Sequence, residues 1–208
     1  MSVFVPAYWP LWRSSKVVRF DYAAADGSVA PITSVFSYDK SSDSMLLDDY
    51  DGNGGAWRDR WYYQYRPDFG IAEWRDDYPG GKKVVMDPPI GWGNNQEIGG
   101  SYINYPKMSL WKSWPPAMSS GCQIVAYEAV LPYFQNMRDK YADVLRFTYL
   151  QSWGGKPAAG ARYWMVKGLG PVSVQWLAQD PKDISKPLIE TARLDAVITV
   201  SDGSQGSS

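Results

Sequence analysis

The segment Trp57–Arg66, with the sequence WRDRWYYQYR, decides the fold class because its alternate positions differ sharply in chemical character. One set of alternate residues is mainly aromatic: Trp57, Asp59, Trp61, Tyr63 and Tyr65. The other set is polar and basic: Arg58, Arg60, Tyr62, Gln64 and Arg66. Successive side chains of a β-strand point to opposite faces of a sheet, so this pattern indicates an antiparallel strand buried on one face.

Similar strand patterns lie on both sides of this segment. Lys16–Tyr22 and Ile32–Tyr38 are rich in β-branched and aromatic residues and are separated by a turn signal, Asp26-Gly27. Later in the chain, Arg162–Lys167 and Val172–Leu177 flank the sequence GLGP and predict a hairpin. Many short strands with turn residues between them favour one strongly curved antiparallel sheet or half-barrel.

Other segments predict less regular structure. Residues 87–121 contain many prolines and glycines with tryptophans between them, and we expect a long aromatic loop that closes the mouth of the sheet. Apolar residues three and four positions apart predict a short helix over about 131–141. Leu188–Val200 fits a final helix or strand, so we expect one or two short helices in all. Residues 1–200 then form a single β-rich domain, and the polar residues 201–208 form a disordered tail.

Composition excludes several classes of function. The chain has no histidine, which removes most zinc and transition-metal sites and any histidine-based catalysis. The net charge is −1 at pH 7 and no basic cluster is present, so we do not expect nucleic-acid binding. Aromatic residues make up 15% of the chain, and they can serve both as core and as stacking platforms for a ligand. The only cysteine, Cys122, has no histidine to activate it, so we expect a structural role.

An acidic, glycine-rich run, DDYDGNGG, precedes the Trp57–Arg66 strand. Asp49, Asp51 and Asn53 match the first ligand positions of a calcium loop of the EF-hand type, but Arg60 stands where that loop requires glutamate. The same glycines and asparagine suit a tight turn. We therefore predict a turn and no bound metal, with calcium at these three residues as the weaker alternative.

Two other groups of residues could carry chemistry. The acidic pairs Asp48/Asp49 and Asp76/Asp77, together with Glu73, would supply a general acid or base if one of them were buried and its pKa raised; otherwise they are solvated turn residues. The polar face of the Trp57–Arg66 strand would offer guanidinium groups and a phenol if it lined a concavity. The alternative for this face is simple exposure to solvent.

Two segments carry a resemblance to known proteins: SVFSYDKSSDSMLLDDYDG at residues 34–52 and ARYWMVKGLGPVSVQW at residues 161–176. They are similar to segments of the lipoprotein-carrier-like half-barrels, a group that includes ependymin-related proteins and prodeoxyviolacein synthase. The resemblance implies a curved antiparallel sheet around an apolar or aromatic ligand, and it implies no catalytic residue. The disulfide cysteines of the ependymin relatives are missing from this chain.

The leading hypothesis is a protein that binds a hydrophobic or aromatic small molecule in the concavity of the sheet, without a cofactor. The expected ligand-binding residues are Arg58, Arg60, Tyr62, Arg66, Trp92, Trp111, Tyr163 and Trp164. One alternative is a cofactor-independent cyclase or isomerase of an aromatic metabolite, with Tyr62, Glu73 and Arg66 as candidate catalytic residues. Another is a tryptophan-rich carbohydrate-binding module with coplanar aromatic rings on an open surface.

The remaining expectations concern location and assembly. No segment reaches the roughly 18 apolar residues of a membrane span, and the first residues do not have the pattern of a signal peptide. We expect a cytoplasmic protein, with an exported form whose signal has been removed as the alternative. The residues do not decide between a monomer and a homodimer.

Overall fold

The computed structural model describes residues 1–10, 13–109, 121–153, 156–178 and 188–202. Thirteen strands form one antiparallel sheet. In spatial order they are β10 (Met108–Ser109), β7 (Lys82–Gly91), β6 (Gly70–Tyr78), β5 (Trp57–Arg66), β4 (Ser44–Asp51), β3 (Ile32–Asp39), β2 (Lys16–Ala24), β17 (Ile189–Asp202), β16 (Gly170–Ala178), β15 (Lys156–Val166), β14 (Val144–Trp153), β11 (Gly121–Leu131) and β9 (Ser101–Asn104).

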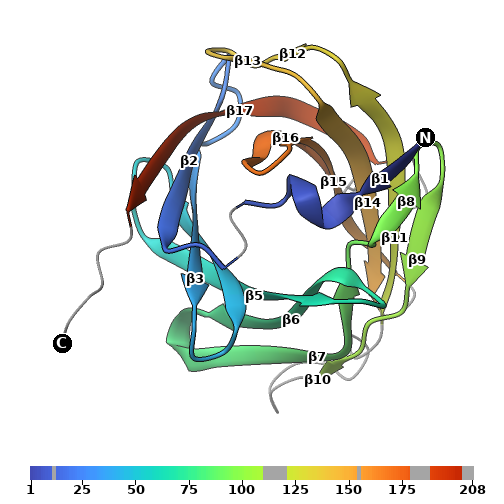
Figure 1. Cartoon of the computed structure of the whole chain (residues 1–208). Coiled ribbons are helices and arrows are strands. Elements are labelled where there is room, and N and C mark those ends of the chain that lie inside the picture. The colour runs from blue at the N-terminus through green and yellow to red at the C-terminus, as the bar shows by residue number, and fades with distance from the viewer. Residues whose placement is uncertain (11–12, 110–120, 154–155, 179–187, 203–208) are drawn as a thin grey trace.

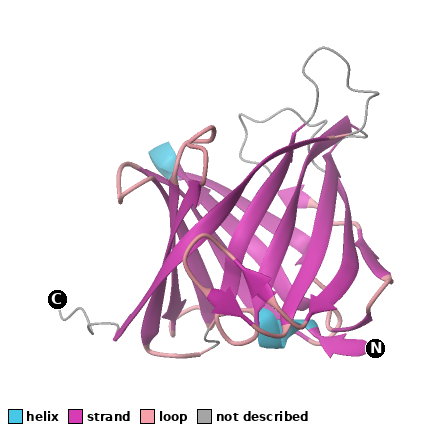
Figure 2. Ribbon diagram, turned by 90° about the horizontal axis from the view of Figure 1, so that it is seen from above, coloured by secondary structure: helices cyan, strands magenta, loops and turns pink. Residues whose placement is uncertain are grey.

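The sheet curls into a nearly closed barrel. Seen along its axis, the strands surround a central space, and from the side they are strongly tilted (Figures 1 and 2). Strands β2 to β7 follow one another around one half of the ring, and β14 to β17 around the other. The pairing of β17 with β2, from Leu194–Ala24 to Asp202–Lys16, joins the two halves. The curvature therefore exceeds that of the predicted half-barrel, while the prediction of a mainly β, antiparallel and curved sheet is confirmed.

Side-chain amides bridge the seam where the ring is incomplete. Strand β7 ends at Gly91, and β9 and β11 lie across the seam. Asn104 of β9 accepts a hydrogen bond from the Gly91 N–H and donates one to the Gly91 carbonyl, both at 3.1 Å. Gln123 of β11 donates to the same carbonyl at 3.0 Å. Because these groups are buried, the side chains replace the backbone ladder that is missing between the strands.

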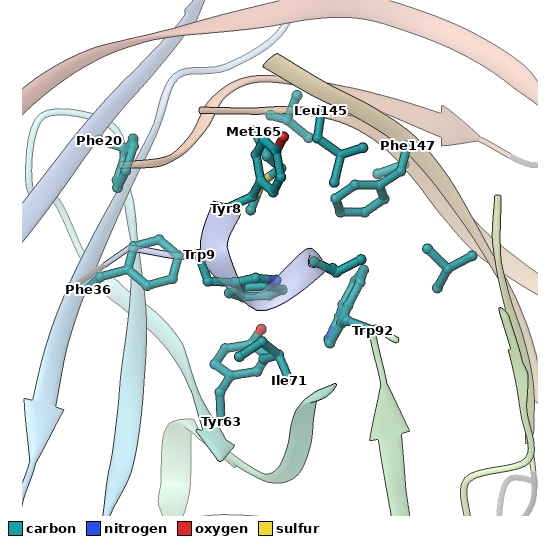
Figure 3. Packing of buried hydrophobic residues seen from close by; sticks show 14 of the residues in the cluster. Tyr8, Trp9, Phe20, Phe36, Tyr63, Ile71, Trp92, Leu145, Phe147 and Met165 are labelled. Atoms are coloured by element: carbon teal, nitrogen blue, oxygen red, sulfur yellow. The ribbon is translucent and has the colours of Figure 1, made fainter. Parts of the chain in front are cut away.

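The N-terminal residues fill one end of the barrel. Strand β1 (Ser2–Phe4) pairs with β8 (Asn95–Glu97), and the 3-10 helix η1 (Val5–Tyr8) follows inside the ring (Figure 1). Trp9 then lies among Tyr63, Trp92 and Phe36, as Figure 3 shows; its ring is 4.9 Å from that of Tyr63 and 5.5 Å from that of Trp92. The second 3-10 helix, η2 (Pro79–Gly81), lies at the other end (Figure 2).

Two hydrophobic clusters form the interior. The larger cluster runs through the barrel and contains most of the aromatic side chains. A smaller one, around Phe134, Val144, Trp164 and Val172, lies beneath the short hairpin of β12 (Phe134–Gln135) and β13 (Lys140–Tyr141). Arg193 covers the stacked rings of Phe134 and Trp164.

Several predictions about individual segments are wrong. Residues 131–141 contain the end of β11 and the strands β12 and β13 instead of a helix. Apolar residues alternate with more exposed ones along β11, and full pairing with β14 overrides the weak helical spacing. The short helices lie at Val5–Tyr8 and Pro79–Gly81 instead. For Leu188–Val200, predicted as a helix or a strand, the strand alternative is confirmed by β17.

The predicted long loop and tail are also partly strand. The segment 87–121 includes the end of β7 and the short strands β8, β9 and β10, and its residues 110–120 lie outside the described part of the chain. Strand β17 continues to Asp202, two residues into the predicted tail, whose residues 203–208 are likewise outside the description. No helix in the described residues has the length and hydrophobicity needed to span a membrane.

Candidate functional site

A cavity of about 350 Å³ lies inside the barrel, and residues of strands β2 to β7 and β14 to β17, together with Trp92, line it. This volume is within the range of small-molecule binding sites. Its wall is mainly aromatic and apolar, with the rings of Tyr22, Phe36, Trp61, Tyr63, Tyr78, Trp92, Tyr149, Tyr163 and Trp176. Its polar lining residues are Ser34, Asp49, Glu73, Asp76 and Gln151.

The aromatic wall is a connected network of rings. Trp92 contacts Tyr149 edge-on at 5.1 Å between ring centroids and Tyr163 at 6.3 Å. Tyr149 and Tyr163, on the neighbouring strands β14 and β15, stack at 5.9 Å with an interplanar angle of 17°. Tyr163 in turn meets Trp176 of β16 at 6.4 Å. Flat apolar surfaces held in fixed orientations are suited to an apolar or aromatic ligand.

Four carboxyl groups come together on the wall formed by β4, β5 and β6, and we refer to Asp49, Asp59, Glu73 and Asp76 as the carboxyl cluster. Asp49 and Asp59 are direct cross-strand partners, and Trp61 is the cross-strand partner of Asp76. Glu73 and Asp76 are buried, with 6% and 3% of their surface exposed. Side chains from three adjacent strands thus place several acids beside one cavity.

A β-bulge in β6 brings Glu73 and Asp76 to the same side of the sheet. Tyr62 pairs with Arg75 and the next residue, Tyr63, pairs with Glu73, so Trp74 is the extra residue on β6. Residues three positions apart would otherwise point to opposite faces. The extra residue reverses this relation, so both acids line the cavity, while Trp74 packs outside against Tyr62.

In each pair of adjacent aspartates, Asp48–Asp49 and Asp76–Asp77, the two carboxyl groups lie on opposite faces of the sheet. Asp48 forms a bidentate ion pair with Arg60, at 2.7 and 2.9 Å, whereas Asp49 lines the cavity. Asp77 likewise pairs with Arg75 at 2.7 and 2.6 Å, whereas Asp76 lines the cavity. Within the described ranges, no Lys or Arg forms an ion pair with a member of the carboxyl cluster.

Burial without a cationic partner raises the pKa of every member of the cluster. Desolvation is the main cause, and it raises the pKa of Asp49 to about 7 and that of Asp59 to about 6. Desolvation also raises the pKa of Glu73 and that of Asp76, and repulsion from neighbouring carboxylates adds to both shifts. The cavity therefore holds carboxyl groups that can take up or release protons near neutral pH.

Few partners within the protein satisfy these acids. The Ser34 hydroxyl donates to Asp49 at 2.6 Å, and the Tyr78 hydroxyl donates to Asp76 Oδ2 at 3.3 Å. Asp76 Oδ1, Asp59 Oδ1 and the indole Nε1 of Trp92 are buried without a hydrogen-bond partner in the described part of the molecule. Native structures rarely leave buried polar atoms unpaired, so Asp76 Oδ1 and Trp92 Nε1, whose residues line the cavity, are suited to a polar group brought by a ligand.

The arginines expected to contact a ligand do not line this cavity. Arg60 and Tyr62 lie on the other face of β5, where Arg60 binds Asp48 and the Tyr62 hydroxyl lies 3.1 Å from Asp77. The exposed Arg58 is 3.8 Å from Asp51, and Arg66 donates to Gln64 at 3.3 Å. The basic side chains of this strand therefore lie outside the barrel, and Trp61 and Tyr63 of the aromatic set line the cavity. Trp57 is exposed and donates to Asp48 on the outer face.

The other candidate residues are divided between the cavity and other places. Trp92, Tyr163 and Glu73 all line the cavity. Trp164 instead belongs to the smaller cluster with Phe134, and Trp111 lies outside the described residues. The residues that the ligand prediction omitted are Asp49, Asp76 and most of the aromatic wall. The alternation in β5 was the available signal for Trp61 and Tyr63, because it identified them as the buried set.

The run DDYDGNGG is a strand end and a turn, as predicted. Strand β4 includes Asp49 and Asp51, and β5 begins at Trp57 after a turn in which Asn53 and Gly54 have φ of 62° and 73°. Asp49 points into the cavity, while Asp51 is exposed beside Arg58. Across the described residues, no group of three or more acidic or cysteine side chains is arranged to hold a metal ion.

Comparisons with known proteins add no further assignment. The chain matches no protein-family model, and it matched neither a curated protein nor a solved structure. The lipoprotein-carrier-like resemblance therefore stays a prediction.

Proposed function

We propose that this protein binds a small molecule with an apolar or aromatic body inside the barrel. The observation that carries the proposal is the aromatic cavity of about 350 Å³ whose wall includes unpaired buried polar atoms. The rings would supply contact area, and the carboxyl cluster and the Trp92 indole would orient a polar part of the ligand. The nearly parallel, stacked rings of Tyr149 and Tyr163 lie inside the barrel, which favours an enclosed ligand over a carbohydrate on an open platform.

Native mass spectrometry of freshly purified protein tests this proposal, together with titration of the neutral fluorescent probe N-phenyl-1-naphthylamine. We expect either a bound species of defined mass or a saturable rise in probe fluorescence. Trp61→Leu should weaken probe binding by about tenfold, because it removes a large part of the cavity wall. Trp57→Leu is the matched control on the same strand, since Trp57 does not line the cavity. Folded protein with neither a bound species nor probe binding would refute the proposal.

The raised pKa values favour a second candidate function, proton-transfer catalysis without a cofactor. A general acid or base works best when its pKa is close to the ambient pH, and Asp49 has a pKa of about 7. Glu73 and Asp76 would then donate protons from their neutral forms to a substrate held against the aromatic wall. Among the predicted catalytic residues, only Glu73 lies at this position.

Deuterium exchange separates this catalytic candidate from simple binding. The species that co-purifies with the protein would be incubated with it in D2O and its mass followed over time. Catalysis predicts incorporation of deuterium at carbon, and loss of this incorporation in Glu73→Gln while binding is retained. Binding without any exchange at carbon would refute the catalytic candidate and leave the binding proposal unaffected.

A further inference from the structure

We propose that the ligand of the cavity is an organic ammonium ion, an amine with an apolar or aromatic body, held by the carboxyl cluster and the surrounding rings. The inference rests on the proposed binding function and specifies the charge of the ligand.

The distribution of charge across the sheet is the first support. The outward carboxylates Asp48 and Asp77 each have an arginine within 3 Å, supplied by Arg60 and Arg75. The inward acids on the same strands have no cationic partner in the described ranges, although Arg58 is near enough to Asp49 and Asp59 to influence them electrostatically. Buried carboxylates are normally paired with a cation. A cationic ligand would supply the charge that is missing on the inner face.

The second support is an unpaired oxygen on a residue that lines the cavity. Asp76 is 3% exposed and lines the cavity, and its Oδ1 has no hydrogen-bond partner within the described protein. An ionised carboxylate oxygen accepts hydrogen bonds, and the N–H groups of an ammonium ion are donors of the required kind. A fully apolar ligand would leave this oxygen unsatisfied, at a cost in affinity.

The aromatic wall is the third support. Cations are attracted to the faces of aromatic rings, and elsewhere in the molecule Arg75 lies 4.5 Å from the ring centroid of Tyr62. Trp61 and Tyr63 are neighbours of the carboxyl cluster on β5, and Tyr163 and Trp176 lie across the cavity. Among the described residues, none of these four rings has an arginine or lysine over its face. A cation brought from solution would therefore not have to displace an arginine or lysine from these rings.

Because the carboxyl groups of the cavity titrate, binding of an ammonium ion should depend on pH. The groups that face the cluster are Ser34 from β3, Arg58, Asp48 and Asp77 through the sheet, and the tyrosines Tyr22, Tyr63, Tyr78, Tyr149 and Tyr163. Burial raises the pKa of all five tyrosines, so they stay neutral and the carboxyl groups alone titrate near pH 7. A bound cation would stabilise the carboxylates and lower their pKa. Binding should therefore release protons and become tighter as the pH rises from 5 to 8.

Three probes with one phenyl body separate charge from shape: 2-phenylethylammonium, 2-phenylethanol and 3-phenylpropanoate. Isothermal titration at pH 8 should show the ammonium ion binding about tenfold or more tightly than the alcohol, with the anion weakest. At pH 6, titration in two buffers of different ionisation enthalpy should show proton release for the ammonium ion only. Equal affinity for the ammonium ion and the alcohol would overturn the inference while leaving the binding function intact.

Substitutions on the two faces of β6 complete the test. Asp76→Asn should weaken binding of 2-phenylethylammonium by about tenfold while changing that of 2-phenylethanol by less than about twofold. Asp77→Asn, the matched control, removes a charge from the outer face at the adjacent position and should leave both affinities unchanged. Glu73→Gln is the second variant if Asp76→Asn does not fold.

Equal effects of the two β6 substitutions would overturn the inference. Failure of all three phenyl probes in protein that still binds N-phenyl-1-naphthylamine would also overturn it. Failure of every probe, with no bound species by mass spectrometry, would refute the binding function itself.

Discussion

Asp48 and Asp49 are adjacent in the chain but lie in opposite electrostatic environments. Asp48 accepts hydrogen bonds from the Arg60 guanidinium and, at 3.1 Å, from the indole of Trp57. Asp49 has a single neutral donor, the Ser34 hydroxyl. A cation therefore faces the first carboxyl group, whereas burial disfavours the ionised form of the second. The same substitution should therefore have opposite effects at the two sites.

We expect Asp48→Asn to lower the free energy of unfolding at pH 8 by about 1–2 kcal/mol, because it leaves the half-buried Arg60 without its carboxylate. Asp49→Asn should be neutral or stabilising at pH 8, because it removes a buried charge and keeps an oxygen that can accept from Ser34. Urea unfolding of both variants measures the difference. A comparable loss of stability at both positions would mean that Asp49 is ionised and well paired.

At the scale of elements, local sequence patterns predict the strands but not the register in which neighbouring strands pair. The alternation in Trp57–Arg66 predicts β5 with its observed bounds, and GLGP predicts the turn between β15 and β16. The bulge at Trp74 has no such local signal. Regular alternation would separate Glu73 from Asp76, so sequence reasoning could name both acids without placing them together. Alternation also does not show whether the buried face of a barrel strand forms core or a cavity wall. For this reason the ligand was predicted on the basic face of β5, which lies outside the barrel.

Hydrogen bonds between residues far apart in the sequence hold the seam between β7 and β9. Asn104→Ala should lower the free energy of unfolding by about 2–3 kcal/mol, because the buried N–H and carbonyl of Gly91 both lose a partner. Asn95→Ala is the control, since Asn95 is exposed. Urea unfolding gives the energies, and faster amide exchange at Gly91 would locate the change. Equal stability of the two variants would show that the seam does not depend on Asn104.

For the whole molecule, the inner and outer carboxyl groups make stability depend on pH in opposite directions. Hydrogen bonds and arginine partners lower the pKa of outer groups such as Asp21 and Asp43, so their contribution is present at neutral pH and is lost in strong acid. The inner groups have raised pKa values, so the folded protein holds protons that the unfolded chain releases once the pH exceeds about 4. Net charge is only −1 at pH 7, so general charge repulsion adds little.

We therefore expect the free energy of unfolding to fall as the pH rises from about 5 to 8. The free energy of unfolding falls because, between these pH values, the folded state binds more protons than the unfolded state. The pKa of about 7 for Asp49, against 3.8 for a free side chain, corresponds to a total loss on the order of 4 kcal/mol as the pH rises from below 4, of which roughly 2–3 kcal/mol falls between pH 5 and pH 8. Urea midpoints measured at pH 5, 6, 7 and 8 test this dependence.

Asp49→Asn should flatten the decline in stability, because the amide does not titrate, whereas Asp77→Asn should leave its slope unchanged.

The stabilisation that a ligand provides should also depend on pH. A saturating ammonium ion should raise the urea midpoint more at pH 8 than at pH 5, because it pairs with carboxylates that the empty cavity disfavours. A midpoint that rises from pH 5 to pH 8 without ligand would mean that the inner acids are already ionised and stabilised within the protein, and no cation would then be required.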